Sequence, residues 1–437
     1  MNYLILSRAG LSLFTVPRLA KSAHAKKIYY CNLDPAQKTD GKSLWNMEGW
    51  EKLVIVTDPY EVINQTPTND LVIIVDDVGI GAQADNLRKQ GYKVVGGSEF
   101  MDKLENERQF ATEFMQKYMK VPESTVFDSF SAGISWLKQQ PREERFVFKP
   151  NDTDVPKEYT YVSKDVADMI QAMEEFKSKW EWEENFQLQR FIKGVEVDFN
   201  AYFNGTDYLP GSFILYFENK PLMNDDIGPA TGGSIAVEFP YKMDGKLYSI
   251  LDNLAGKMKE VGYRGQIAIN SIISEEDHEP YFLEFTSRFG YPSLPMEVTL
   301  VEDNNKNFAD LIDAMANGTT PKLFPENVIA GVVSVEAGMS SGEGATKGVE
   351  MSWSSQYDRY FFPYGVMYGK GRKYELTGKQ GNHAVDVTCS TDNLSGVVEM
   401  IYDNYMPTLK LKDKMYRTDL GKSAKDRMKK LHEWGLI

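Results

Sequence analysis

The sequence predicts an α/β protein that begins with a doubly wound parallel sheet and ends in a β-rich part. Two observations support this fold class. Short apolar runs alternate with helical patterns through the first hundred residues, and after about residue 320 the pattern changes to short β runs with many glycines. The 437 residues are 42% hydrophobic and 26% charged, which is enough apolar material for a sizeable core.

Five apolar runs in the first hundred residues predict strands, at residues 3–7, 27–31, 52–58, 71–77 and 92–97. A helical pattern at 82–91 ends at Gly91, a plausible C-cap. Ligands of parallel sheets lie at the carboxyl ends of the strands, where the segments "SRAG" (7–10) and "DDVGIG" (76–81) fall. Both segments could equally be ordinary turns between a strand and a helix.

The middle of the chain is predicted to mix long strands and helices. A helix is expected at 102–120, ending before a Val-Pro step, and a βαβ-like module at 145–194. The remaining elements are expected in the following order: strands at 195–203 and 211–218, a helix at 246–262, strands at 265–273 and within 279–292, short β runs, and a terminal helix.

The stretch "EPYFLEFTSRFGYP" (279–292) carries Glu284, Thr286 and Arg288 at alternate positions. In a strand these side chains share one face, roughly 6.6 Å apart. A carboxylate suits Mg²⁺, and an arginine fork can hold a phosphoryl oxygen. The alternative interpretation is an ion pair on the wet face of a half-buried strand.

Two further segments fit phosphate chemistry, although each has a simpler explanation. Lys149 ends the strand pattern "FVFKP", where it could pair with a phosphate or lie in water. The stretch "LMNDDIGPATGGS" (222–234) could present amide groups to an anion or form a turn. Only four histidines occur and none is paired at metal-ligand spacing, which leaves phosphoryl transfer without a protein nucleophile as a reasonable chemistry.

Charge and composition exclude several classes of protein. The formal charge of −14 argues against a nucleic-acid binder, and no apolar run is long enough to span a membrane. The N-terminus lacks the pattern of a signal peptide, and the two cysteines are far apart in the sequence. A cytoplasmic protein with reduced thiols is expected.

Taken in order, these stretches resemble the ATP-grasp family over nearly the whole chain, and within it the phosphoribosylamine–glycine ligases of purine synthesis. The similarity lies in six segments: residues 104–122, "FVFKP" (146–150), "LQRFIKGVEVDF" (188–199), "NKPLMNDDIGPATGG" (219–233), "LEFTSRFGYP" (283–292) and "MYRTDLGKSA" (415–424). The resemblance implies an ATP-grasp fold with a substrate domain at 1–100, an ATP-grasp domain at 101–325 that contains a mobile lid at 145–193, and a β-rich subdomain at 326–437.

The resemblance also assigns roles to individual residues. It implies that ATP is bound by Arg108, Lys149, Leu188, Gln189, Arg190 and Glu196. It implies a metal site of Glu284, Thr286 and Asn270 for Mg²⁺, or alternatively Mn²⁺. The implied catalytic residues are Arg288, Lys220 and Asp226, and the implied substrate-binding residues are Thr231, Gly232 and Gly233.

The implied reaction joins a carboxylate to an amine in two steps. ATP phosphorylates the carboxylate to an acyl phosphate, and the amine then displaces phosphate to give an amide. The implied substrates are an amino acid and an amine, which is either free or carried on a sugar phosphate. The enzyme itself is expected to be a monomer or a homodimer.

Several positions depart from the family pattern and keep other functions open. The metal-binding Asn of the family is Thr286, an aspartate of the family is Tyr291, and the first loop reads "SRAGLSL" (7–13). The phosphate-covering loop at 150–160 has no glycine and three acidic residues, Asp152, Asp154 and Glu158. The alternatives are a paralogue that joins a different amino acid and amine, and a nucleotide-binding homologue that has lost catalysis.

Overall fold

The computed structural model describes residues 1–8, 10–34, 50–150, 160–179, 185–338, 346–368, 373–379 and 381–437. The chain forms two compact units. Unit 1 comprises Met1–Asp102, Val197–Ala268 and Thr286–Ile437, and unit 2 comprises Lys103–Glu196 and Ile269–Phe285. We describe each unit by itself. The domain limits expected from the sequence stay a prediction.

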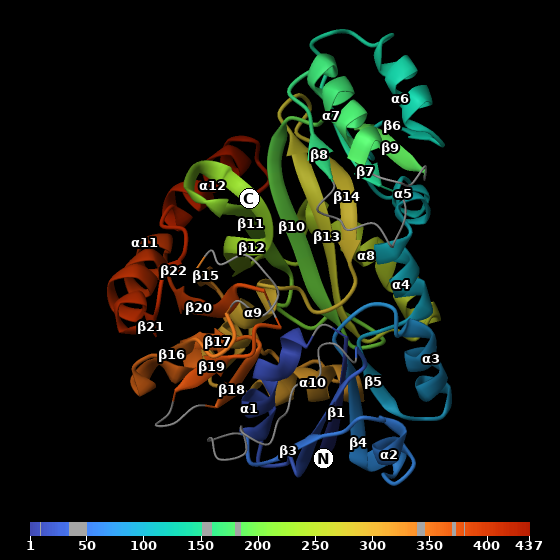
Figure 1. Ribbon diagram of the computed structural model, residues 1–437. Helices are drawn as coiled ribbons and strands as arrows, with labels where there is room; N and C mark the ends of the chain where they lie inside the picture. The colour runs from blue at the N-terminus through green and yellow to red at the C-terminus, as the bar shows by residue number, and fades with distance from the viewer. Residues whose placement is uncertain are drawn as a thin grey trace. The chain divides into compact units, whose positions relative to one another are not determined.

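The N-terminal sheet of unit 1 confirms all five predicted strands. Every pairing is parallel, and the strand order is β3-β2-β1-β4-β5. The strands are β1 (Asn2–Ser7), β2 (Lys27–Asn32), β3 (Leu53–Ile55), β4 (Leu71–Val75) and β5 (Lys93–Val95). The helices of this region are α1 (Thr15–Ala20), α2 (Tyr60–Ile63) and α3 (Gly81–Lys89), with 3₁₀ turns at Leu11–Phe14 and Thr68–Asp70. All five residues of β4 are buried, as expected of a parallel strand covered on both faces (Figure 1).

A large sheet, mostly antiparallel where the pairing is defined, contains strands of both units. Its order is β14-β13-β10-β11-β12-β15-β20-β17, with β22 paired to β15. The first five strands of this order are β14 (Pro280–Thr286), β13 (Gly265–Ser274), β10 (Gly194–Phe203), β11 (Ile214–Met223) and β12 (Ile227–Pro240). The others are β15 (Ile329–Ala337), β20 (His383–Thr391), β17 (Phe361–Pro363) and β22 (Lys414–Met415). Strands β10, β13 and β14 each pass from one unit into the other.

The rest of unit 1 supplies helices and a small sheet. The small sheet has the order β18-β19-β16-β21, from Val366–Tyr368, Tyr374–Leu376, Glu350–Ser352 and Lys410–Leu411. The helices are α8 (Gly245–Glu260), α9 (Ser293–Asp303), α10 (Phe308–Asn317), α11 (Leu394–Glu399) and α12 (Leu420–Glu433). Short helical turns lie at Asn224–Asp226, Ser355–Tyr360, Met400–Tyr405 and Met406–Thr408. Helix α9 is buried from Ser293 to Val301 and packs against β15 and β20.

Glu238 and Glu297 are two of the carboxyl groups that are buried in unit 1. Glu297 on α9 accepts hydrogen bonds from Asn200 (2.8 Å), Gln266 (2.6 Å) and the hydroxyl of Tyr202. Glu238 on β12 is fully buried, and neither of its oxygens accepts a hydrogen bond from a described residue. Burial and the nearby Glu297 raise the pKa of Glu238 well above its ordinary value, and burial raises that of Glu297 to about 7.

Unit 2 contains a small antiparallel sheet covered by two helices. The sheet order is β6-β9-β7-β8, from Ser124–Phe127, Phe186–Arg190, Phe146–Pro150 and Tyr161–Val162. Helices α6 (Phe130–Leu137) and α7 (Val166–Lys179) bury an aromatic core against it, which includes stacked rings of Phe130, Phe148 and Phe186. The predicted βαβ-like module is present, but β7 and β9 are antiparallel.

Two predictions about elements were wrong. The single helix expected at 102–120 is divided into α4 (Glu99–Asn106) and α5 (Arg108–Met115), because Glu107 between them has φ −104° and ψ 88°. The Thr-Gly-Gly segment expected in a loop lies within strand β12, paired with β11 in a long irregular hairpin. The glycines and prolines that suggested a loop instead accompany register shifts within the hairpin.

Candidate functional site

One face of the small sheet in unit 2 carries buried polar side chains. Lys149 on β7 lies directly opposite Gln187 on β9, and Val147 lies opposite Gln189. Directly opposed residues of an antiparallel pair share a face, so Lys149, Gln187 and Gln189 lie on the same side. Their exposed fractions are only 8%, 6% and 5%. The structure therefore places the predicted Lys149 and Gln189 together and adds Gln187, which the sequence analysis missed.

The neighbouring predicted residues of β9 do not share this face. The side chain of Leu188 belongs to the aromatic core under α6 and α7. Arg190 pairs with Glu144 (2.7 Å) and Glu123 (3.6 Å) at the surface. Only the backbone of Leu188 remains available for a ligand on the polar face, because alternate residues of a strand point to opposite sides.

Four other predicted residues of unit 2 lie on or beside three adjacent strands. Glu284 lies on β14, Asn270 on β13 and Glu196 on β10, and these strands are neighbours in the large sheet. Arg108, the first residue of α5, has its Nη1 atom 3.7 Å from the carboxylate of Glu284. The Glu284 side chain is 31% exposed and that of Arg108 is 15% exposed, so the pair is partly shielded from water. The helix break at Glu107 starts α5 at this arginine.

The donor set in unit 2 fits a magnesium ion that also binds phosphates. Mg²⁺ prefers oxygen ligands and usually takes one or two carboxylates together with substrate oxygens. Glu284 offers the carboxylate and Asn270 an amide oxygen from the adjacent strand. Among the described residues, no group of three or more His, Cys, Asp or Glu side chains could hold a metal by itself. The set thus suits a metal ion that the protein shares with a bound substrate, and not a structural metal site formed by protein ligands alone.

The row of Glu284, Thr286 and Arg288 is divided by the boundary between the units, which falls after Phe285. Strand β14 ends at Thr286, so Arg288 lies beyond the strand. The predicted alternation persists, since Phe285, Ser287 and Phe289 are buried and the three row residues are half-buried. Within unit 1, Arg288 donates to the carbonyl of Phe289 (3.0 Å) and its Nε atom is 3.9 Å from Asp77.

In the β11–β12 hairpin of unit 1, Asp226 is held in place by hydrogen bonds, one of them from the C-terminal segment. Arg417, whose side chain is 1% exposed, donates to Asp226 (2.7 Å), to both oxygens of Asp419 and to the carbonyl of Pro221 (3.0 Å). Asn219 donates to the same oxygen of Asp226 (2.8 Å). Arg417 belongs to the last of the six similar segments, but its partner could not be deduced because 191 residues separate it from Asp226.

The other predicted residues of the hairpin have contacts within unit 1. The Nζ atom of Lys220 lies 3.7 Å from Glu218. The hydroxyl of Thr231 donates to the carbonyl of Lys220 (2.7 Å) and accepts the N–H of Gly233 (3.1 Å). Gly233 has φ +141°, and a Cβ atom there would lie 2.5 Å from Pro292. Close packing within the protein thus explains this glycine, whereas a Cβ at Gly232 would meet nothing within 4 Å.

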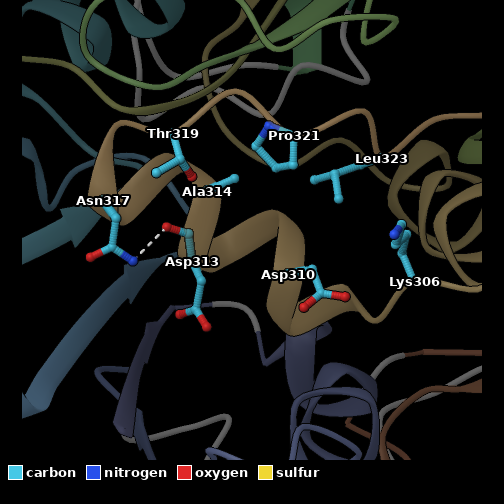
Figure 2. A pocket seen from close by; sticks show the side chains of 8 residues that line it. All are labelled: Lys306, Asp310, Asp313, Ala314, Asn317, Thr319, Pro321 and Leu323. Atoms are coloured by element: carbon cyan, nitrogen blue, oxygen red, sulfur yellow. Dashed lines mark hydrogen bonds between the residues drawn. The ribbon is translucent and has the colours of Figure 1, made fainter.

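Two other features bear on the location of the site. Residues 151–159 of the acidic loop, including Asp152, Asp154 and Glu158, lie outside the described residues. A pocket of about 280 Å³ lies along α10, lined by Asp310, Asp313, Asn317 and neighbours (Figure 2). Its acids have structural partners, since Asp310 caps α10 at Asn307 and Asp313 accepts from Tyr3. None of the residues predicted from the sequence lines this pocket.

Comparison with known proteins identifies relatives along the whole chain. No family model matches the sequence. The phosphoribosylamine–glycine ligase of Streptococcus pneumoniae is 23% identical over 444 residues, covering 97% of this chain and 100% of that protein. A ligase of the same name from Listeria innocua is 23% identical over 445 residues, with the same coverage.

Solved structures share the fold. Phosphoribosylamine–glycine ligase from Thermotoga maritima superposes with a TM-score of 0.71 at 17% identity, covering 96% of this chain and 100% of that chain. The biotin carboxylase domain of Hydrogenobacter thermophilus 2-oxoglutarate carboxylase, solved with MgADP and bicarbonate, gives a TM-score of 0.63 at 10% identity, covering 99% and 97%. No described helix has the length and apolar character needed to cross a bilayer. The chain therefore has the ATP-grasp fold and is similar along nearly its whole length to the phosphoribosylamine–glycine ligases.

Proposed function

We propose that this protein is an ATP-dependent, ADP-forming ligase that joins a carboxylate to an amine, as in the glycine-using step of purine synthesis. The observation that carries the proposal is the grouping in unit 2 of Glu284, Asn270 and Arg108, with Arg108 3.7 Å from Glu284. The names of the relatives support the same reaction class.

In the proposed reaction the carboxylate is activated as an acyl phosphate, and the amine then attacks the acyl carbon and releases phosphate. ATP would supply the phosphoryl group, and Mg²⁺ would neutralise the charge of its phosphates. Glu284 and Asn270 would hold the Mg²⁺ ion, with the hydroxyl of Thr286 as a further oxygen ligand. This division suits a site without a protein nucleophile, because phosphoryl transfer depends mainly on positioning and charge.

The chain's own residues have separate tasks in this proposal. Lys149 and Arg108 would bring positive charge to the phosphates. Gln187 and Gln189 would offer amide groups on the polar face of the small sheet in unit 2. Arg288 would hold the transferred phosphoryl group through a two-pronged fork. Asp226 would act from the hairpin in the orientation fixed by Arg417, beside Lys220 and Thr231. We place the enzyme in the cytoplasm, where its thiols would be reduced.

Trapping of the acyl phosphate tests this function directly. The protein is incubated with ATP, Mg²⁺, hydroxylamine and each amino acid in turn, and both hydroxamate and ADP are measured. We expect equal amounts of hydroxamate and ADP with at least one amino acid. If no amino acid releases ADP while calorimetry still detects MgATP binding, the protein is instead a nucleotide-binding homologue without ligase activity.

The metal role of Glu284 is tested by Glu284→Gln, which keeps the shape of the side chain and removes its charge. We expect hydroxamate formation to fall at least a hundredfold, with an unchanged circular dichroism spectrum, because the amide is a far poorer Mg²⁺ ligand. Glu276→Gln, in the exposed turn before β14, is the matched control. Equal activity of the Glu284 variant and the control would contradict the metal role.

A further inference from the structure

A chain of hydrogen bonds connects the guanidinium of Arg288 to a carboxylate inside unit 1. Nη1 of Arg288 donates to the carbonyl of Phe289 (3.0 Å). The N–H of Gly290, which belongs to the same peptide group, donates to Oε1 of Gln266 (3.0 Å). Nε2 of Gln266 in turn donates to Oε1 of Glu297 (2.6 Å). We call this series the Arg288–Glu297 chain, and it runs from a cation to an anion through a backbone amide and a side-chain amide.

The inner end of the Arg288–Glu297 chain is fixed in the core of unit 1. Glu297 on α9 is fully buried, and it also accepts hydrogen bonds from Asn200 on β10 (2.8 Å) and from the hydroxyl of Tyr202. Gln266 on β13 is 1% exposed. Supporting contacts of this kind are what hold the residues of a functional site within about 0.5 Å of their working positions. Two strands and a helix therefore determine where the Gln266 amide points.

The residues on both sides of Arg288 are attached to this core. Strand β14 ends at Thr286, so Arg288 lies outside the strand. Before it, the carbonyl of Ser287 accepts from the hydroxyl of Tyr263 (3.1 Å), and the hydroxyl of Ser287 donates to the carbonyl of Met101 (2.8 Å). After it, Gly290 is held by Gln266. Arg288 thus lies between two anchored positions of the backbone.

The direction of the hydrogen bonds strengthens the Arg288–Glu297 chain. Each of its two amides accepts at the oxygen and donates at the nitrogen, so their dipoles are aligned between the positive and the negative end. Aligned hydrogen bonds polarise one another, and bonds to charged groups are stronger than neutral ones. A reversed Gln266 amide would direct its NH₂ group at the N–H of Gly290, where two donors meet. The chain therefore favours one orientation of the Gln266 side chain.

We infer that Gln266 and Glu297 are positioning residues of the ligase reaction, which act on the Arg288 guanidinium through the peptide group between Phe289 and Gly290. The inference rests on the proposed function, in which Arg288 holds the transferred phosphoryl group. A misplacement of about 1 Å at a reacting group can lower a rate about a hundredfold, so the direction of this fork matters. Gln266 and Glu297 are buried, so they act through Arg288 and not by touching the substrate.

A double-mutant cycle tests the inference. Gln266→Met keeps the length of the side chain and removes both amide groups. We expect it to lower kcat for hydroxamate formation by roughly tenfold to thirtyfold, with the KM for ATP within about threefold of the wild type. In the Arg288→Lys background the same exchange should change kcat by less than about twofold, because the fork that Gln266 positions is absent.

Two results of the cycle would overturn the inference. One is a wild-type kcat for Gln266→Met, and the other is an equal fold-change in the wild-type and Arg288→Lys backgrounds, which is the result for a residue with a general structural role. If Gln266→Met does not fold, Gln266→Glu takes its place, because it keeps an oxygen for the N–H of Gly290 and loses the donor to Glu297.

Thr299→Val is the matched control for the loss of a buried hydrogen bond. Thr299 lies on the same helix as Glu297, is 1% exposed and donates to the carbonyl of Pro295 (2.9 Å). The exchange should lower the melting temperature, as Gln266→Met does, while kcat stays within about twofold of the wild type. A loss of kcat equal to that of Gln266→Met would assign both effects to general destabilisation.

Two exchanges at Glu297 separate its hydrogen bond from its volume. Glu297→Gln keeps an oxygen that can accept from Gln266, whereas Glu297→Met keeps the length of the side chain without an acceptor. We expect Glu297→Gln to retain several-fold more activity than Glu297→Met. Equal kcat values for these two variants would contradict a positioning role of the hydrogen bond.

Hydrogen exchange of the Gly290 amide distinguishes failure of this inference from failure of the ligase proposal. This N–H is bound to Gln266, so it should exchange at least about tenfold faster in Gln266→Met than in the wild type, whether or not the protein makes hydroxamate. Absence of hydroxamate in the wild type would count against the ligase, and the exchange rate would still show whether Gln266 holds this segment. An unchanged exchange rate in the variant would refute the inference even for an active ligase.

Discussion

Arg288 reaches two groups of unit 1 through different nitrogen atoms of its guanidinium. Its Nη1 atom donates to the carbonyl of Phe289 (3.0 Å), while its Nε atom faces Asp77 (3.9 Å). The guanidinium is planar and fixes several donors in one fork, whereas lysine offers a single point charge. In the proposed mechanism this fork holds the transferred phosphoryl group.

We therefore expect Arg288→Lys to lower kcat for hydroxamate formation by roughly 10² to 10³, the usual effect of removing one donor to a developing charge. The circular dichroism spectrum should be unchanged. Arg142→Lys, an exposed exchange in unit 2, is the matched control. A rate for the Arg288 variant within threefold of the control would show that a point charge suffices.

Among individual residues, the sequence predicted those whose environment follows from a short local pattern. The half-buried Glu284, Thr286 and Arg288 alternate with buried neighbours as expected, because alternation is a local property of the backbone. It could not separate Leu188, which packs in the aromatic core of unit 2, from Gln189, because both fit the same motif.

The β11–β12 hairpin shows how one buried side chain can hold an element. Arg417 is 1% exposed and bonds Asp226, Asp419 and Pro221, while Ser423 on α12 donates to Asn219 (2.7 Å). Near the turn, Met223 and Ile227 are exposed, so apolar packing contributes little there. Charge-assisted hydrogen bonds therefore fix this part of the hairpin.

Arg417→Gln should lower the free energy of unfolding by on the order of 3 kcal/mol, because it leaves the half-buried Asp419 without its cation. The effect should lie at the lower end for broken buried pairs, since the Asp226 side chain is 53% exposed. Urea unfolding gives the value. Lys422→Gln, which removes an exposed ion pair between α12 and Asp225, should change the free energy of unfolding little. Equal stability of the two variants would contradict the anchoring role.

Among elements, apolar periodicity predicted the five parallel strands and the long strands β10 and β13. It failed at the helix expected at 102–120 and at the Thr-Gly-Gly segment of β12. The expected helix at 102–120 breaks at Glu107, just before the arginine that pairs with Glu284. The Gly-Pro and Gly-Gly steps of β12 suggested a loop, but pairing with β11 makes them part of a strand.

The molecule as a whole buries several titratable groups whose pKa values are raised. Glu238, Glu297 and Asp76 are shifted upward by burial, and His383 is shifted upward by Asp386 and Glu336 although burial opposes this. A group with a raised pKa holds its proton longer in the native state than in the unfolded chain. The native protein then binds more protons between the two pKa values, so stability falls as the pH rises through that range.

We expect the free energy of unfolding to decrease between about pH 5 and pH 8, and Glu238→Gln to reduce this slope. At pH 8 the variant should be more stable than the wild type by about 1 to 3 kcal/mol, because the unfolded wild-type chain ionises Glu238 readily while burial opposes this in the native state, and the amide does not ionise. Urea unfolding at several pH values measures both quantities. Glu260→Gln, on the exposed face of α8, is the control, and a wild-type slope in the Glu238 variant would refute the assignment.

The general architecture was predictable from the sequence because it depends on apolar periodicity and on the order of motifs along the chain. The buried pair of Glu238 and Glu297 was not, because 59 positions separate the two acids and no local pattern marks an acid as buried. Residues 151–159, on which the acidic loop prediction depends, lie outside the described part of the chain.

The bond between Arg417 and Asp226 spans 191 residues. During synthesis the hairpin emerges from the ribosome long before its guanidinium partner is translated. A nascent chain therefore cannot form this bond until Arg417, 191 residues after Asp226, has also been synthesised, and a chain that stops before Arg417 would leave Asp226 without this partner.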